Sequence, residues 1–451
     1  MSTVDRARLA GLHARERQAF LEARPRSRAL AEQAAAHMPG GVPMSWMVKW
    51  PGDFPVFVAG AAGAHFTCVD GIDHVDLCLG DTGAMMGHSP APTVEAVTHQ
   101  LARGITTMLP TEDAIAVSSG LAERFGLPYW QFTLTATDAN RHAIRYARHL
   151  TGRSKVVVHN WCYHGSVDEA FATLGPGGAT TNRPGNIGAP VPTSETTRVV
   201  EFNDLAALEQ ALAHGDVAAI LVEPALTNIG IVLPDPGYNE GVRELATRYG
   251  ALLVNDETHT ICAGPGGYTG AHGLQPDMLV IGKSIGGGIP CGTFGFSQQI
   301  ADRIATSVEL EEIDVGGIGG TLAGNGLSMA AMKATLEQVM TAEAFEWMVP
   351  LADAWADGVQ AGIDAVGADW HVTRLGARAE YNFSGRPSRD GQDAHDADDF
   401  ELQQYLHLHA LNRGILLTPF HNMALMSPAT TAADVDAHTE MFGACLKELF
   451  A

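Results

Sequence analysis

The alternation of short apolar runs with helical stretches is the feature of this 451-residue chain that most limits its fold. Seven apolar runs of strand length occur in the central part of the chain, at residues 130–134, 155–159, 198–202, 218–222, 251–255, 278–281 and 293–296. Helical segments separate several of them, at 138–150, 205–213 and 239–249, and a glycine that can end a helix follows each within two residues. Such alternation predicts an α/β domain built on a mostly parallel, seven-stranded sheet.

The two ends of the chain have a different pattern. Residues 4–37 are amphipathic and helical, and Pro39-Gly40-Gly41 breaks that pattern before a short β segment. From about residue 340 the sequence reads as helix, strand, polar loop (384–398), helix, strand and helix. We therefore expect an N-terminal helical and β segment (1–75) that belongs to a small domain, a large domain (76–338) and a small C-terminal α+β domain (339–451).

Charge and composition exclude several classes of function. The chain has 28 basic and 51 acidic residues, a net charge of -23, which opposes binding to nucleic acids and to anionic membranes. Its six cysteines are scattered and form no cluster with metal-ligand spacing, so reduced thiols and no metal site are expected. No signal peptide and no long apolar segment is apparent, which favours a cytoplasmic protein.

Lys283 is the first candidate for chemistry. It follows the apolar run 278–281 and precedes three consecutive glycines, Gly286, Gly287 and Gly288. In α/β sheets, ligands bind beyond the carboxyl ends of the strands, and glycines let the backbone approach a bound group closely. A lysine at such a place can form a Schiff base with a carbonyl cofactor. A solvated lysine that caps a strand is the alternative, so the assignment depends on other residues.

Asp256 ends the preceding apolar run and supplies the opposite charge. A carboxylate beside a pyridine nitrogen keeps that nitrogen protonated and makes pyridoxal phosphate an electron sink, while a lysine holds the aldehyde of the cofactor. Alone, an aspartate such as Asp256 is more often part of a strand-end turn or a helix cap than a catalytic residue. Together with Lys283 it favours pyridoxal phosphate chemistry.

Three further strand ends carry suitable side chains. Tyr163, in a Tyr-His-Gly turn, could stack on a flat cofactor, although aromatic residues often belong to the core. Thr137 lies where a helix begins after the run 130–134, and the free N–H groups of a helix N-terminus suit a phosphate; an ordinary helix cap is the alternative. Glu223 is expected to orient a neighbouring polar group or to bound the substrate space.

In their order and spacing, these motifs resemble those of the class III aminotransferases, and in particular their glutamate-1-semialdehyde aminomutase-like branch. The similarity extends from Pro39 to Asp436. The motifs that carry it are Tyr163-His164-Gly165, Glu223-Pro224, Asp256-Glu257, Gly282-Lys283-Ser284 followed by the glycines, and Gly320-Thr321.

The resemblance implies a fold type I homodimer that binds pyridoxal 5'-phosphate. Lys283 would then form the Schiff base with the cofactor, Asp256 would pair with the pyridine nitrogen and Tyr163 would stack on the ring. Ala136 and Thr137 would bind the phosphate through backbone and hydroxyl groups.

Three more positions bear on the cofactor. Thr321 would reach the phosphate of the partner subunit, which makes the site a property of the dimer. Ala136 replaces a glycine of the family, and would be strained by about 1 kcal/mol if the position required a positive φ. Thr258 replaces a valine and brings a hydroxyl towards the cofactor.

The substrate side departs further from the family. Some relatives that act on β-amino acids have an arginine near the position of Met44, which this chain lacks. Trp46 could line an apolar substrate pocket or pack between the N-terminal segment and the core. Arg378 could bind a substrate carboxylate with two hydrogen bonds, or pair with Glu380 on the same face of its strand. His421 is a third candidate substrate contact.

These features predict a pyridoxal phosphate-dependent aminotransferase with a ping-pong mechanism. It would move an amino group from a small amine or amino acid, β-amino acids included, to a keto acid, aldehyde or ketone. An intramolecular aminomutase of the glutamate-1-semialdehyde type and a lyase with the same cofactor are the enzymatic alternatives. A catalytically silent binding protein that kept the fold is the alternative from another class.

Overall fold

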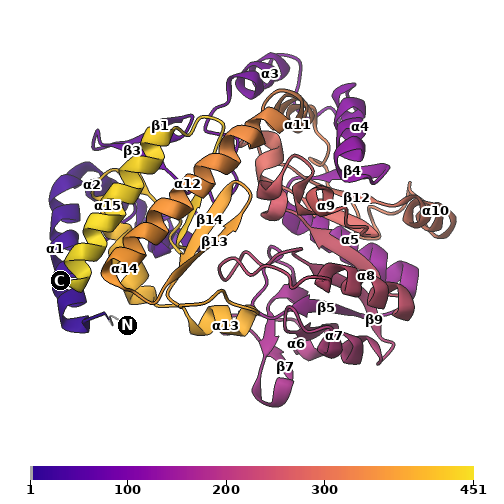
Figure 1. Ribbon diagram of the computed structural model, residues 1–451. Helices are drawn as coiled ribbons and strands as arrows, with labels where there is room; N and C mark the ends of the chain where they lie inside the picture. The colour runs from indigo at the N-terminus through magenta and orange to yellow at the C-terminus, as the bar shows by residue number, and fades with distance from the viewer. Residues whose placement is uncertain (1–3) are drawn as a thin grey trace. The chain divides into compact units, whose positions relative to one another are not determined.

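The computed structural model describes residues 4–451 and divides into two compact units (Figure 1). Unit 1 comprises the chain up to Pro90 with Glu343–Pro387 and Ala397–Ala451; unit 2 comprises Ala91–Ala342 and Ser388–Asp396. The first boundary lies later than the expected residue 75, because the segment after it bonds to unit 1. The Leu77 N–H donates to the Leu416 carbonyl, and the Leu425 N–H donates to the Leu77 carbonyl.

Unit 2 contains the seven-stranded sheet, and all seven predicted strands are present. The order across the sheet is β4-β12-β11-β10-β9-β5-β8. The pairs from β11 to β8 are parallel, whereas β12 is antiparallel to both of its neighbours. The strands are β4 (Tyr129–Thr133), β5 (Lys155–His159), β8 (Thr197–Val200), β9 (Val217–Val222), β10 (Leu252–Asp256), β11 (Met278–Ile281) and β12 (Gly292–Phe296). The prediction of a mostly parallel α/β sheet is confirmed.

Helices surround this sheet, and the three predicted ones are present as α5, α7 and α8. The longest of these, α5, begins where the Thr135 hydroxyl accepts a hydrogen bond from the Asp138 N–H, and ends at Gly152 in the left-handed conformation. The helices of unit 2 are α3 (Ala91–Leu101), α4 (Asp113–Phe125), α5 (Ala136–Thr151), α6 (Thr193–Thr196), α7 (Leu205–Leu212), α8 (Tyr238–Tyr249), α9 (Gly267–His272), α10 (Gln298–Ser307), α11 (Gly326–Gln338) and α13 (Gly391–Asp396). A two-stranded hairpin, β6 (Ala172–Leu174) and β7 (Thr180–Asn182), completes the unit.

Unit 1 has the α+β character expected of the small domain. One of its sheets joins the N-terminal and C-terminal parts of the chain, since β3 pairs in parallel with β15. Its helices are α1 (Arg6–Ala23), α2 (Pro25–Ala34), α12 (Ala342–Val366), α14 (Phe400–Leu411) and α15 (Ala432–Phe450); its strands are β1 (Val58–Ala62), β2 (His65–Cys68), β3 (Asp73–Asp76), β13 (His371–Leu375), β14 (Arg378–Asn382), β15 (Ile415–Leu416) and β16 (Met423–Leu425). Among residues 4–451, no helix has the length and apolar character needed to cross a membrane.

Candidate active site

Lys283 occupies a constrained position after β11. It opens a 3-10 turn (Lys283–Gly286) and has a φ of 52°, in the left-handed region that costs a residue with a side chain about 1–2 kcal/mol. Before it, a Cβ on Gly282 would lie 3.0 Å from the Cβ of Ala136, so only glycine lets this strand end approach the start of α5 closely. The Lys283 Nζ lies 2.8 Å from the Nε2 of His259, in the loop after β10. Such strain is typical of a side chain held in place for function.

Asp256 is the last residue of β10, and its carboxylate is buried with three donors around it. The Asn140 amide donates to Oδ2 at 2.8 Å, and the His164 Nδ1 lies 3.0 Å from the same oxygen. The backbone N–H of Thr258 donates to Oδ1 at 3.1 Å. Since Asn140 belongs to α5 and His164 follows β5, Asp256 joins three separate segments at the carboxyl edge of the sheet.

The pair formed by Asp256 and His164 is charged at neutral pH. Burial is the largest single influence on Asp256 and raises its pKa, but the hydrogen bond and charge of His164, together with the hydrogen bond from Asn140, outweigh burial and lower that pKa below its ordinary value. Burial alone would lower the pKa of His164, but Cys162 and Asp256 outweigh it and raise that pKa to about 10. An ionised carboxylate is thus held in a buried place, as a partner for a protonated ring nitrogen must be.

This pair should make the stability of the protein depend on pH. Because the pKa of His164 is raised from 6.5 to about 10, its stabilising effect is complete below about pH 6.5 and is lost as the pH rises towards 10. The lowered pKa of Asp256 acts in the opposite direction, and its stabilising effect is lost only in acid. We expect the melting temperature to fall more steeply between pH 7 and about 10 in the wild type than in His164→Gln.

Thermal unfolding followed by circular dichroism at a series of pH values measures this difference. His149→Gln is the matched control, because His149 is an exposed residue of α5 whose ring nitrogen bonds to the Ser307 carbonyl and to no carboxylate among the described contacts. The control should follow the wild-type slope. Equal slopes for wild type and His164→Gln would contradict the assigned charge of His164.

The predicted phosphate turn lies at the beginning of α5. Ala136 is the first residue of that helix and has no positive φ, so alanine in place of glycine introduces no left-handed strain here. The Thr137 hydroxyl accepts a hydrogen bond from the Ser166 N–H at 3.1 Å. A Cβ on Gly165 would lie 2.1 Å from that hydroxyl, which explains the glycine of the Tyr-His-Gly turn. The N–H groups of this helix end are directed as an anion-binding site requires.

A hydrogen bond joins Tyr163, which follows β5, to Glu223, which follows β9. The Tyr163 ring is 39% exposed and meets Phe171 edge-on, with ring centres 6.4 Å apart. Its backbone N–H donates to the buried Glu223 carboxyl at 3.4 Å, and the other oxygen of that carboxyl accepts from the Thr227 N–H at 3.1 Å. Burial raises the pKa of Glu223. Glu223 therefore bonds to the backbone of the residue that carries the aromatic ring, and its role in the site stays a prediction.

The polar atoms left over around Asp256 fit pyridoxal phosphate. The hydroxyls of Thr258 and Ser284 and the amide oxygen of Asn140 are buried and have no hydrogen-bond partner among the described residues. Buried polar groups normally find a partner, so a polar ligand is expected beside them. A buried carboxylate, a primary amine and a helix N-terminus match the pyridine nitrogen, the aldehyde and the phosphate of this cofactor. Thr321 lies in the exposed loop before α11, and its role towards a partner subunit stays a prediction.

The three candidate substrate residues lie in unit 1. Arg378 is fully buried, and its guanidinium donates to Glu380 at 3.0 Å. The Nδ1 of His421 lies 3.2 Å from the other oxygen of that carboxylate. Trp46 packs edge-on against Phe420, with ring centres 6.1 Å apart. The alternatives from sequence, pairing with Glu380 and packing of the N-terminal segment, are therefore present, and the substrate roles stay predictions.

Sequence reasoning missed three residues of the site. Asn140 and His164 bind the Asp256 carboxylate, and His259 contacts Lys283. One sequence feature could have pointed to all three as site residues, since each is a polar side chain that follows the end of a predicted strand within six residues.

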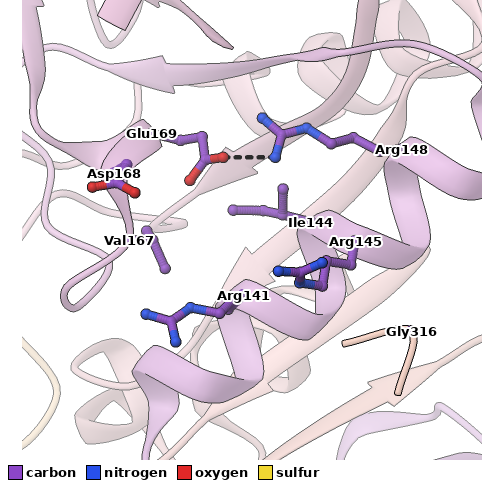
Figure 2. Close-up of a pocket in the computed structure, with 8 residues that line it drawn as sticks. All are labelled: Arg141, Ile144, Arg145, Arg148, Val167, Asp168, Glu169 and Gly316. Carbon is purple, nitrogen blue, oxygen red and sulfur yellow. Dashed lines mark ion pairs between the residues drawn. The ribbon is translucent and has the colours of Figure 1, made fainter. Parts of the chain in front are cut away.

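A separate cavity lies along the later turns of α5 (Figure 2). Three arginines of this helix, Arg141, Arg145 and Arg148, line it together with residues 167–169, and its volume is about 430 Å³. Arg148 forms an ion pair with Glu169 at 2.7 Å, which ties α5 to the segment after the Tyr163 turn. The lining includes none of the residues that surround Lys283 and Asp256, so this cavity is not the predicted cofactor site.

Comparisons with known proteins agree with this geometry. The family model of the class III aminotransferases matches residues 47–446. A glutamate-1-semialdehyde 2,1-aminomutase of Anaeromyxobacter sp. (strain K) is 34% identical over 417 residues, which cover 91% of this chain and 95% of that protein.

Two solved structures show the same fold. The crystal structure of a glutamate-1-semialdehyde-aminomutase variant from Pseudomonas aeruginosa PAO1 in complex with PMP has a TM-score of 0.97 and 49% identity, and covers 99% of both chains. A β-phenylalanine aminotransferase from Variovorax paradoxus has a TM-score of 0.86 and 29% identity, and covers 97% of both chains. The chain therefore belongs to the class III aminotransferases, the pyridoxal phosphate-dependent enzymes of fold type I.

Proposed function

We propose that this enzyme moves an amino group within one carbon skeleton, as an aminomutase of the glutamate-1-semialdehyde type. The observation that carries the proposal is the similarity to aminomutases over nearly the whole chain, with a TM-score of 0.97 for one of them. Intermolecular transfer was the first expectation from sequence, and the comparisons support its alternative better.

In this proposal several groups of the protein hold the cofactor. Asp256 carries an ionised carboxylate for the pyridine nitrogen, and the Asn140 and His164 donors keep that carboxylate in place. Ala136 and Thr137, at the N-terminus of α5, bind the phosphate. Bound there, pyridoxal phosphate withdraws electrons from the carbon that carries the amino group. Tyr163 covers a face of the ring, and Thr321 binds the phosphate of the partner subunit in a homodimer.

Lys283 has two roles in this proposal. Its Nζ would hold the cofactor covalently between turnovers and would be a free amine while substrate is bound. The freed amine then takes a proton from the substrate carbon and returns it to another atom. The fixed backbone of Lys283 limits where its amine can move.

An intermolecular aminotransferase is the second candidate, and a specific observation favours it. The segment that contains Met44 lacks the arginine that some relatives have there, and its Trp46 packs against Phe420. An apolar wall of this kind suits a substrate with a bulky apolar group better than a small aliphatic monocarboxylate such as glutamate-1-semialdehyde. The similarity to the β-phenylalanine aminotransferase points in the same direction.

Turnover of a single substrate distinguishes the two reactions. An aminomutase should convert many equivalents of glutamate-1-semialdehyde per active site into an isomer of equal mass, with no second substrate. An aminotransferase should stop after one equivalent of a lone amino donor, such as β-phenylalanine, and resume when a keto acid is added. Liquid chromatography and mass spectrometry of the products measure the equivalents converted per active site, with and without a keto acid. A reaction with glutamate-1-semialdehyde that stalls until a keto acid is supplied would overturn the aminomutase proposal.

A further inference from the structure

The side chain of His259 contacts the reactive end of Lys283. Its Nε2 lies 2.8 Å from the Lys283 Nζ, and both side chains are partly buried. We propose that His259 is a positioning residue for Lys283, which holds the freed amine and exchanges a proton with it during turnover. The inference rests on the proposed role of Lys283, but not on which amino-group reaction the enzyme performs.

The backbone on both sides of His259 is fixed, so its ring can serve as a fixed point. The Glu257 N–H donates to the Val280 carbonyl at 2.8 Å, which ties this loop to β11. After His259 a 3-10 turn (Thr260–Ala263) begins, and the Cys262 N–H donates to the His259 carbonyl at 3.2 Å. The buried Thr260 hydroxyl donates to the Glu257 carboxyl at 2.5 Å.

Lys283 needs such a fixed point. Its Cα is held by the left-handed backbone, but the four-carbon side chain of a free lysine can still adopt many rotamers. An ammonium group has only donors, whereas the unprotonated nitrogen of a neutral imidazole accepts a hydrogen bond. A distance of 2.8 Å is right for this bond. The bond would confine the amine near one position between its successive proton transfers.

Imidazole also suits the second part of the proposal. It can accept a proton and release it again near neutral pH, which the hydroxyl of the adjacent Thr258 cannot do. The proton that the Lys283 amine takes from the substrate carbon can pass to the Nε2 of His259 and return. No bond other than an N–H bond is made or broken in this exchange.

Two substitutions separate holding from proton exchange. His259→Met removes both functions and keeps a side chain of similar length, while His259→Gln keeps an acceptor oxygen that cannot take up a proton. We expect kcat to fall about 100-fold in the methionine variant, with little change in KM, the scale on which a positioned acid-base group acts. Added imidazole should restore part of the rate in His259→Ala.

A second measurement does not depend on catalysis. In the apoenzyme, Lys283 can be labelled with an amine-reactive reagent, and the extent of labelling can be measured by peptide mass spectrometry. Lys333 is the internal reference, because it is distant from His259 in the sequence and its amine pairs with Asp113. The ratio of the two labelling rates should change severalfold in His259→Met and less in His259→Gln. If either variant does not fold, the other still gives this ratio.

The outcomes are distinct. Unchanged labelling of Lys283 together with unchanged kcat in both variants would overturn the inference. A fully active His259→Gln would overturn proton exchange. If Lys283→Ala itself retained turnover, the proposed function would fail, whereas the labelling ratio would still report on the contact between His259 and Lys283.

Discussion

Lys283→Ala should lose covalent attachment of the cofactor and nearly all turnover. Alanine has no amine to bond to the aldehyde of pyridoxal phosphate and none to move the proton, and loss of a covalent anchor that is also an acid-base group costs about 10³-fold or more in rate. The visible absorbance of the purified protein, read after removal of unbound cofactor, reports attachment. A single-turnover assay with an amino donor reports the chemical step.

Lys333→Ala is the matched control for this substitution. Lys333 lies on α11 in the same unit, and its ion pair with Asp113 at 2.9 Å is partly exposed, so its loss should change stability by less than about 1 kcal/mol. Attachment and turnover should stay at wild-type level in the control. If Lys283→Ala kept its visible absorbance and its turnover, Lys283 would not be the cofactor lysine.

The sheet could be predicted because each of its strands has a local signal. The runs 155–159 and 278–281 coincide with β5 and β11, and the other five differ from the observed strands by one or two residues at an end. The parallel order then determines the edge at which strand ends meet, because parallel strands share one carboxyl edge. Asp256 and Lys283 could be assigned to that edge from this reasoning alone.

The contacts within the site could not be predicted in the same way. The bond between Asn140 and Asp256 joins α5 to β10, and that between His259 and Lys283 joins two loops. Such bonds depend on how closely the backbones approach, which is set by packing and not by a local pattern. Asn140 in particular lies in the first turns of a helix, where sequence gives an asparagine many other uses.

The polar stretch 384–398 shows the same limit. It was expected to be a loop of the small domain, but it contains α13 and its central part belongs to unit 2. The Asn203 side-chain amide donates to the Arg389 carbonyl at 2.8 Å, and the His395 ring stacks on Trp161 with centres 3.9 Å apart. Asn203 lies 186 residues before Arg389 in the sequence, and Trp161 lies even further from His395. No local sequence pattern therefore marks the central part of residues 384–398 as belonging to unit 2.

Arg378 shows where the sequence left a real choice. A strand places residues 378 and 380 on one face, so pairing of Arg378 with Glu380 and binding of a substrate carboxylate were both consistent with the pattern. The buried ion pair at 3.0 Å is present, and His421 shares the same carboxylate. A substrate acid that binds Arg378 would have to compete with Glu380 for it.

Asp256→Asn should reduce turnover by about 100-fold or more, the scale of one lost electrostatic contact in an active site. The amide has no charge to keep the pyridine nitrogen protonated. The amide also places an NH₂ donor where the Asp256 carboxylate only accepts hydrogen bonds. The buried His164 then has no counter-charge. Removal of one partner from a buried ion pair costs about 3–5 kcal/mol, so the unfolding midpoint in denaturant should fall as well.

Two further variants assign these losses to their causes. Asp256→Glu keeps the charge but moves it, so it should retain part of the stability while most of the turnover is still lost. Asp277→Asn removes a carboxylate of the same sheet before β11, at the opposite edge from Lys283, where Asp277 pairs with Arg243 at 2.9 Å. That variant should keep normal turnover. If Asp256→Asn were as active as Asp277→Asn, the carboxylate would not be the partner of the ring nitrogen, and the buried pair of Asp256 and His164 would serve stability alone.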